Sequence, residues 1–399
     1  MELAPWNLKS IAMPLDFSLL TGQVRALGAS LRASHDQRIS RIEWACEQLH
    51  AQADRWEHWC QQVREKHARA PWLLACPAEP LDVVRDLPRC PQSYGLAASD
   101  GSQIDLDRHG PAECYLVNIG LVLLRYGEDA GARLWTEPRL YYEEKDLVLV
   151  DDRGRRYAVE GPLVHATRDV AEGQMLAAIA RELPPSLPRL ALQDGTLIRW
   201  PFHGFDPFVR DHYLKGYLEA LDHLQMAGIP LASYISRPRA PEVTGLVRLF
   251  ADPELERAGS YAEADPCQGL IDQLIFNALL RPGQRGPLFM SMSRINVEHY
   301  DAHQIHFFYL NTGRELARVE VPRWVAAEPA LVDLVHALIY DQCQRGAGYP
   351  VALARAHEQA VVRETDRRTF RLLLESTLLH ARLSTAGSLK QASKERTIV

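Results

Sequence analysis

The stretches that decide the fold are YGLAASDGSQIDLD at residues 94–107 and LALQDG at residues 190–195. In each, a run of small and apolar residues leads into an Asp-Gly pair, Asp100-Gly101 and Asp194-Gly195. Apolar runs of this length that meet turn residues predict buried β-strands. One Asp-Gly pair is ordinary turn chemistry. Two of them on neighbouring strands would bring two carboxylates together at one edge of a sheet.

The pattern around these stretches predicts an α/β fold in which helices pack on a mixed sheet. Strands are expected at about residues 94–108, 115–126, 147–150, 190–195 and 229–236, with a hairpin at 304–325. Helices are expected at about residues 165–183, 207–227, 328–345 and 350–383.

The first 70 residues have a different character. No glycine or proline occurs between Gly28 and Pro71, and apolar residues recur there at steps of three and four, which predicts a helix over about residues 15–70. This helix is either an arm that pairs with another subunit or an amphipathic helix folded onto its own domain. We expect a helical arm with a proline-rich linker over 1–91, a main domain over 92–385 and a disordered tail over 386–399.

Composition limits the class of protein. The chain has 399 residues and a formal net charge of -6, which argues mildly against a general affinity for nucleic acid. Its seven cysteines form no C-x-x-C pair, so neither a zinc site nor a disulfide framework is expected. We expect neither a signal peptide nor a membrane-spanning segment, and the sequence shows no Gly-rich Lys-Ser/Thr loop for ATP. We expect a soluble cytoplasmic protein with no membrane partner.

Carboxylates are the candidate chemistry, because hard divalent cations prefer oxygen ligands. Asp105 and Asp107 lie an odd number of residues from Asp100 and would face the other side of the strand, which favours Asp100. Glu172, on the helix between the two Asp-Gly strands, is the candidate third acid, unless it is an ordinary solvated glutamate. His357, two turns into the last helical region, could bind metal or transfer a proton, or it could be a surface histidine.

The joint order of these motifs resembles the NurA nuclease domain over about residues 92–385. The matching segments are SDGSQ at 99–103, YLVNIG at 115–120, an R-x-x-x-E helix ending at Glu172, LQDGTL at 192–197, YISR at 234–237, ARVEVPRW at 317–324 and GYPVALARAHEQA at 348–360. Position by position, the resemblance implies that Asp100, Glu172 and Asp194 are acidic metal ligands. It places the family's C-terminal tyrosine and histidine at Tyr349 and His357.

The resemblance also implies an RNase H-like sheet, two manganese ions (or magnesium) and cleavage of DNA as a 5'-3' exonuclease and single-strand endonuclease. Its expected partners are DNA, a second copy of the chain and a HerA-like hexameric ATPase, with which it would act in DNA end resection and repair. Glu182, on the same helix, is the alternative to Glu172. Arg237 stands where the family has lysine, a change that preserves contact with phosphate.

Ser102, Arg199 and Arg237 are the predicted DNA contacts, and Trp200 and Phe202 are either base-stacking residues or core residues. Two other functions compete with a NurA-type nuclease. The chain could be a catalytically inactive structural or DNA-loading subunit of a translocase complex, although it retains every expected acid. It could also be another RNase H-like enzyme, such as a resolvase or an RNA-cleaving enzyme.

Overall fold

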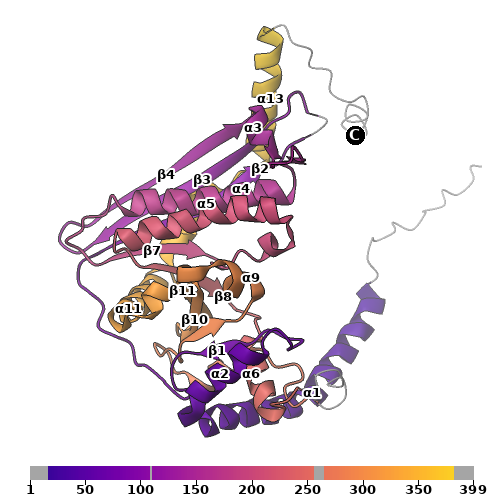
Figure 1. The fold of residues 1–399 in the computed structure, drawn as a ribbon, viewed down its shortest axis with the longest axis vertical. Helices are drawn as coiled ribbons and strands as arrows, with labels where there is room; N and C mark the ends of the chain where they lie inside the picture. The colour runs from indigo at the N-terminus through magenta and orange to yellow at the C-terminus, as the bar shows by residue number, and fades with distance from the viewer. Residues whose placement is uncertain (1–16, 108–109, 256–264, 382–399) are drawn as a thin grey trace, which may run out of the picture.

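The computed structural model describes residues 17–107, 110–255 and 265–381, and their centre is a nine-stranded mixed sheet (Figure 1). The strands follow the order β1-β9-β10-β11-β8-β7-β2-β3-β4. They are β1 (Ala75–Pro77), β2 (Tyr94–Ile104), β3 (Tyr115–Tyr126), β4 (Gly131–Tyr141), β7 (Arg189–Asp194), β8 (Leu231–Ser236), β9 (Phe289–Ser291), β10 (Ile305–Asn311) and β11 (Leu316–Pro322).

Five of these strands, in the order β4-β3-β2-β7-β8, form the unit that carries the Asp-Gly motifs. β2, β3 and β4 are antiparallel neighbours, and β7 and β8 continue the sheet parallel to β2. Parallel neighbours need crossover connections, which here include α4 (Pro162–Ala180) before β7 and α5 (Pro207–Met226) before β8. This is the predicted mixed sheet flanked by helices, and the predicted N-terminal helical extension is also present.

Helices cover both faces of this unit. The remaining helices are α1 (Phe17–Ala51), α2 (Trp56–Lys66), α3 (Glu144–Leu147), α6 (Glu242–Ala251), α8 (Asp272–Leu279), α9 (Arg294–His299), α10 (Arg323–Ala326), α11 (Pro329–Arg345), α12 (Val351–Ala360) and α13 (Glu364–His380). Ala97 of β2 packs in the core beneath α4 and α5, whereas Ala98 packs in the core beneath α11 and α12. Because strand residues alternate between faces, Asp100 shares the α12 face with Ala98.

Gly120 allows α12 to lie directly on the sheet. It pairs with Asp100 across β2 and β3, and a Cβ on it would lie 2.3 Å from the Ala356 carbonyl oxygen and 2.4 Å from the Ala360 nitrogen. A glycine inside a strand commonly marks such a close backbone approach. The end of α12 is held by Asn118, whose side-chain amide donates to the Ala360 carbonyl at 2.8 Å.

The N-terminal arm departs from one continuous helix, because a 3-10 turn at Ala53–Arg55 separates α1 from α2. Leu49, Trp59 and Val63 are buried in a core shared with α6 and α8. This second half of the arm therefore folds onto its own domain, one of the two expected arrangements. Apolar side chains of the first half, Phe17 among them, are exposed, and their pairing with another subunit stays a prediction.

The predicted linker is wrong for part of residues 71–91, because this segment contributes β1 to the sheet edge. β1 pairs antiparallel with β9, and Leu74 and Leu81 on either side of it are buried. Glu79 forms a 2.9 Å ion pair with Arg285, which ties the segment to the loop before β9. The apolar residues between the prolines find a core here, so the segment is fixed by packing.

Three further differences concern the boundaries of elements. β4 was absent from the predicted strands, and β5 (Val148–Val150) pairs with β6 (Arg156–Ala158) in a separate two-stranded sheet. The predicted helix at 350–383 is divided into α12 and α13, and α13 projects from the body (Figure 1). The predicted tail at 386–399 lies outside the described residues. Among those residues, no helix is both long and apolar enough to cross a membrane.

We expect Gly120→Ala to lower the free energy of unfolding by about 1–3 kcal/mol, because the added methyl group would push α12 off the sheet. Gly204→Ala is the matched control, since a Cβ there meets nothing within 4 Å. Urea unfolding of both variants measures the difference. Equal stabilities would show that α12 is not seated on Gly120.

Candidate active site

β2 and α12 bring Asp100 and His357 into contact at the sheet edge. Asp100 Oδ2 lies 2.7 Å from His357 Nδ1, and Asp100 Oδ1 accepts a hydrogen bond from the Gly101 nitrogen at 2.8 Å. The Asp100 side chain is 20% exposed and the His357 side chain 67%. The carboxylate is thus partly enclosed, while the imidazole that it orients faces solvent.

Asp194 and Tyr349 form a second pair beside the first. Asp194 ends β7, and its Oδ1 accepts hydrogen bonds from the Tyr349 hydroxyl at 2.7 Å and from the Gly195 nitrogen at 2.9 Å. Loss of solvation raises the pKa of Asp194, the Asp100 charge raises it further, and Tyr349 and His357 oppose the shift. The two pairs therefore belong to one electrostatic neighbourhood.

Glu172 reaches the same point from the α4 face of the sheet. Its Oε1 accepts a hydrogen bond from Gln193 at 2.9 Å, and its Oε2 would lie 3.2 Å from a Cβ on Gly101. Burial raises the pKa of Glu172 to about 8, with the Asp100 charge adding to the shift and Arg199 opposing it. Since Gly101 has no side chain, the Glu172 carboxyl group can approach β2 directly behind Asp100.

Glu182 lies elsewhere. It follows the end of α4, its side chain is 47% exposed, and it forms a 2.8 Å ion pair with Arg133 of β4. Of the two glutamates that the sequence left open, Glu172 is the one whose charge is coupled to Asp100.

The predicted DNA contacts have different environments. The Arg199 side chain is 9% exposed, lies 3.7 Å from Asp169 Oδ2 and stacks over the Tyr217 ring, so it acts as a buried countercharge rather than the predicted phosphate contact. Ser102 donates its hydroxyl to the Ala360 carbonyl at 2.5 Å and so helps to seat α12. The Arg237 side chain, in contrast, is 82% exposed, and its Nε lies 3.7 Å from Glu315 Oε2.

The two candidate stacking residues also differ. Phe202 is 1% exposed and packs in the core beneath α5, which agrees with its interpretation as a core residue. Trp200, two residues earlier, is 37% exposed. Only Trp200 of this pair presents ring surface to a base.

The acidic residues do not form a closed metal cage. In the described ranges, no group of three or more His, Cys, Asp or Glu side chains is arranged to hold a metal ion. The donor chemistry nevertheless fits a divalent cation, because three carboxyl groups and an imidazole adjoin one another and Asp100 disfavours ionisation of the other two acids. A positive charge among them would relieve that repulsion.

Glu320 is a residue of the site that the sequence interpretation missed. It is fully buried on β11, and its Oε2 accepts hydrogen bonds from the Leu197 nitrogen at 2.8 Å and the Thr196 hydroxyl at 2.9 Å. Its Oε1 is 2.9 Å from Nε of Arg318, which also pairs with Glu242 at 2.7 Å. This network fixes the loop that follows Asp194. The available signal was a pair of charges within an otherwise apolar strand.

Asp100 and Asp194 thus lie at one edge of a mixed sheet, with Glu172 beside them, and oxygen ligands of this kind suit a divalent cation. A family model, the NurA domain, matches residues 95–362. The chain therefore belongs to the NurA family, a family of nucleases that act in DNA end processing.

Among solved structures, the chain is similar to "Crystal structure of NurA with manganese". The identity is 10% and the TM-score 0.39, and the match covers 76% of this chain and 93% of that chain. No curated protein matches the chain.

We expect Glu320→Gln to destabilise the protein by about 3–5 kcal/mol, because it leaves the buried Arg318 without one of its two carboxylate partners. Glu298→Gln is the control, since Glu298 forms an exposed pair with Arg294 that should contribute about 0.5 kcal/mol or less. Denaturant unfolding compares the two. Similar losses would contradict a structural role for the buried network.

The raised pKa of Glu172 predicts a dependence of stability on pH in metal-free buffer. From its unfolded value of about 4.3 up to about 8, the folded chain holds this proton more tightly than the unfolded chain. The free energy of unfolding therefore falls as pH rises through that window. Glu172→Gln should lose less stability than the wild type between pH 6 and pH 8.5 in urea unfolding with EDTA. Parallel pH profiles would show that Glu172 titrates normally.

Proposed function

We propose that this chain is a metal-dependent deoxyribonuclease that hydrolyses phosphodiester bonds with Asp100, Glu172 and Asp194 as its acidic metal ligands. One observation carries the proposal: Asp100 and Asp194 each follow a paired position, Ser99 and Gln193, on the neighbouring parallel strands β2 and β7. Glu172 Oε2 would lie 3.2 Å from a Cβ on Gly101, the residue after Asp100. Neighbouring carboxylates repel one another, so ionising all three acids is unfavourable unless a cation lies among them. The family to which the chain belongs supplies the reaction class.

The proposed cofactor is a pair of Mn²⁺ ions, with Mg²⁺ as the alternative. Carboxylate oxygens suit both ions, and Mn²⁺ also accepts imidazole, which His357 offers beside Asp100. When bound, two such ions supply charge for activating water and for stabilising the leaving oxygen. His357 is thus either a ligand or the group that moves a proton.

Residues of the chain perform the remaining tasks. Asp100 holds Nδ1 of His357, which leaves Nε2 free to exchange a proton with a phosphodiester oxygen. Burial and the neighbouring Asp194 raise the pKa of Tyr349, so its hydroxyl stays protonated and orients the Asp194 carboxylate through the hydrogen bond that it donates. Arg237, on the rim, contacts a phosphate through its exposed guanidinium.

The finer assignments rest on family membership. The chain acts as a 5'-3' exonuclease and single-strand endonuclease in DNA end resection and repair. It works as a homodimer, together with a HerA-like hexameric ATPase. The exposed apolar residues in the first half of α1 leave surface for such an assembly.

A second function is favoured by one specific observation. In the part of the chain that the structure describes, Asp100 and Asp194 are each hydrogen-bonded to another side chain, and no three-donor cation cluster is formed. A catalytically inactive structural or DNA-loading subunit of a translocase complex would tolerate that arrangement.

We expect the wild type to digest labelled single-stranded DNA in the presence of Mn²⁺, and Asp100→Ala to lose more than about 100-fold in rate. Loss of a residue that only hydrogen-bonds to a metal ligand already costs about 10–100-fold. Asp105→Ala, an exposed acid at the end of the same strand, should cut normally. Circular dichroism checks that both variants fold.

Each outcome of this assay is informative. Cleavage that survives Asp100→Ala would refute the assignment of the acids. A wild type that cuts nothing with Mn²⁺ or Mg²⁺ would favour the inactive subunit. In a competition between labelled DNA and labelled RNA, preferred cleavage of RNA would favour another RNase H-like enzyme over a deoxyribonuclease.

A further inference from the structure

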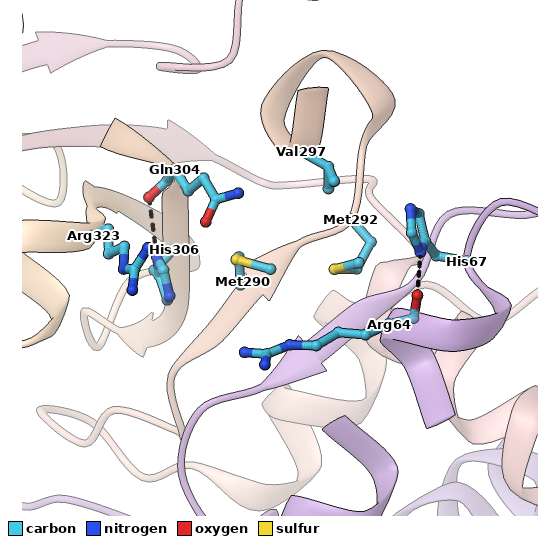
Figure 2. Close-up of a pocket in the computed structure, with 8 residues that line it drawn as sticks. All are labelled: Arg64, His67, Met290, Met292, Val297, Gln304, His306 and Arg323. Atoms are coloured by element: carbon cyan, nitrogen blue, oxygen red, sulfur yellow. Dashed lines mark hydrogen bonds between the residues drawn. The ribbon is translucent and has the colours of Figure 1, made fainter. Parts of the chain in front are cut away.

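A cavity of about 420 Å³ lies between the end of α2 and the strands β9 and β10. Figure 2 shows Arg64 and His67 at the end of α2 on one side of it, and His306 of β10 and Arg323 at the start of α10 on the other. Met290 and Met292 lie between them. The volume lies within the range of about 300–1,000 Å³ that is usual for ligand sites.

The ionisable residues that line this cavity are all of the basic types. Its lining residues include two arginines and two histidines but no aspartate or glutamate. In the described part of the chain, neither Arg64 nor Arg323 forms an ion pair with a carboxylate. The two guanidinium groups therefore converge on a space without a balancing anion, which is the arrangement that binds phosphate.

His306 lies within the field of that charge. His306 Nδ1 lies 3.0 Å from the Gln304 carbonyl oxygen, which requires the proton on Nδ1 and leaves Nε2 for other partners. Burial lowers the pKa of His306 to about 4, and the positive charges of Arg323 and Arg64 contribute to the shift. An anion in the cavity would offset the charge that now lowers this pKa.

Apart from Gln304, the rest of the lining is apolar. Met290 and Met292 are 9% and 5% exposed, and Val297 completes this side of the cavity. Thioether side chains are flexible and make favourable contacts with aromatic rings. An anion site that adjoins such a surface suits a phosphate joined to a flat base.

We propose that this cavity binds one nucleotide unit of a nucleic-acid strand, with the phosphate between Arg64 and Arg323 and the base against Met290 and Met292. The inference rests on the proposed function for its ligand, since a nuclease presents such strands to its surface. The site is separate from the acidic residues: β7, which carries Asp194, is three strands from β10, which carries His306. Three strand spacings are about 14 Å, which equals about four nucleotides of a stacked strand.

The test is equilibrium binding in EDTA, which separates it from cleavage. The probe is a 5'-phosphorylated dT12 with a 3' fluorescein, followed by anisotropy on the full chain. Arg64→Glu combined with Arg323→Glu should weaken binding at least 10-fold, and the salt slope should fall by about 0.7 for each lost phosphate contact. Arg153→Glu combined with Arg281→Glu makes the same charge change at exposed arginines outside the cavity.

A milder double variant, Arg64→Gln with Arg323→Gln, guards against misfolding and should show a smaller loss in the same direction. The proposal is overturned if the cavity variants bind dT12 as the control variant does. It is also overturned if dTMP or inorganic phosphate binds as tightly as dT12, because the ligand is then a free anion. Cleavage by the wild type is scored separately, so a failed nuclease assignment and a failed cavity assignment give different results.

Discussion

Repulsion between neighbouring carboxyl groups is the constraint around which the acidic site is built. Asp100 lies where its charge disfavours ionisation of both Asp194 and Glu172. Each acid has a neighbour that stabilises its charge. His357 contacts Asp100, the Tyr349 hydroxyl donates to Asp194, and the buried Arg199 favours ionisation of Glu172. These partners let the acids persist in a folded protein and leave them available to a cation.

The site also depends on two glycines that let separate layers meet at one strand pair. Gly101 opens β2 to the Glu172 carboxyl group from the α4 face, and Gly120 lets α12 carry His357 onto the opposite face. On β11, Glu320 fixes the loop after Asp194 through a charge network buried far from solvent. The positions of the acids are therefore set in part by residues outside the proposed set of metal ligands.

Local pattern was sufficient for the apolar strands that end in Asp-Gly, for α4 and α5, and for the α/β class. It could not identify β4, whose residues are exposed on both faces and show no alternation. The prolines at residues 71–91 predicted a linker, whereas the leucines between them are buried and the segment contributes β1 to the sheet. The burial of Arg199 and the role of Glu320 depend on which strands become neighbours, and that information is not present in any single segment. The cavity at Arg64 depends on such distant pairing too.

The site needs side chains from both helical layers, His357 from α12 and Glu172 from α4. It is therefore lost if either helix leaves the sheet, even when the rest of the fold is intact. α12 has ten residues and leans on the sheet through backbone contacts at Gly120 and a carbonyl at its last residue. Detaching such a short helix requires less free energy than opening the central strands. Molecules with an intact sheet but a displaced α12 would be native by most spectroscopic criteria and yet lack an assembled site.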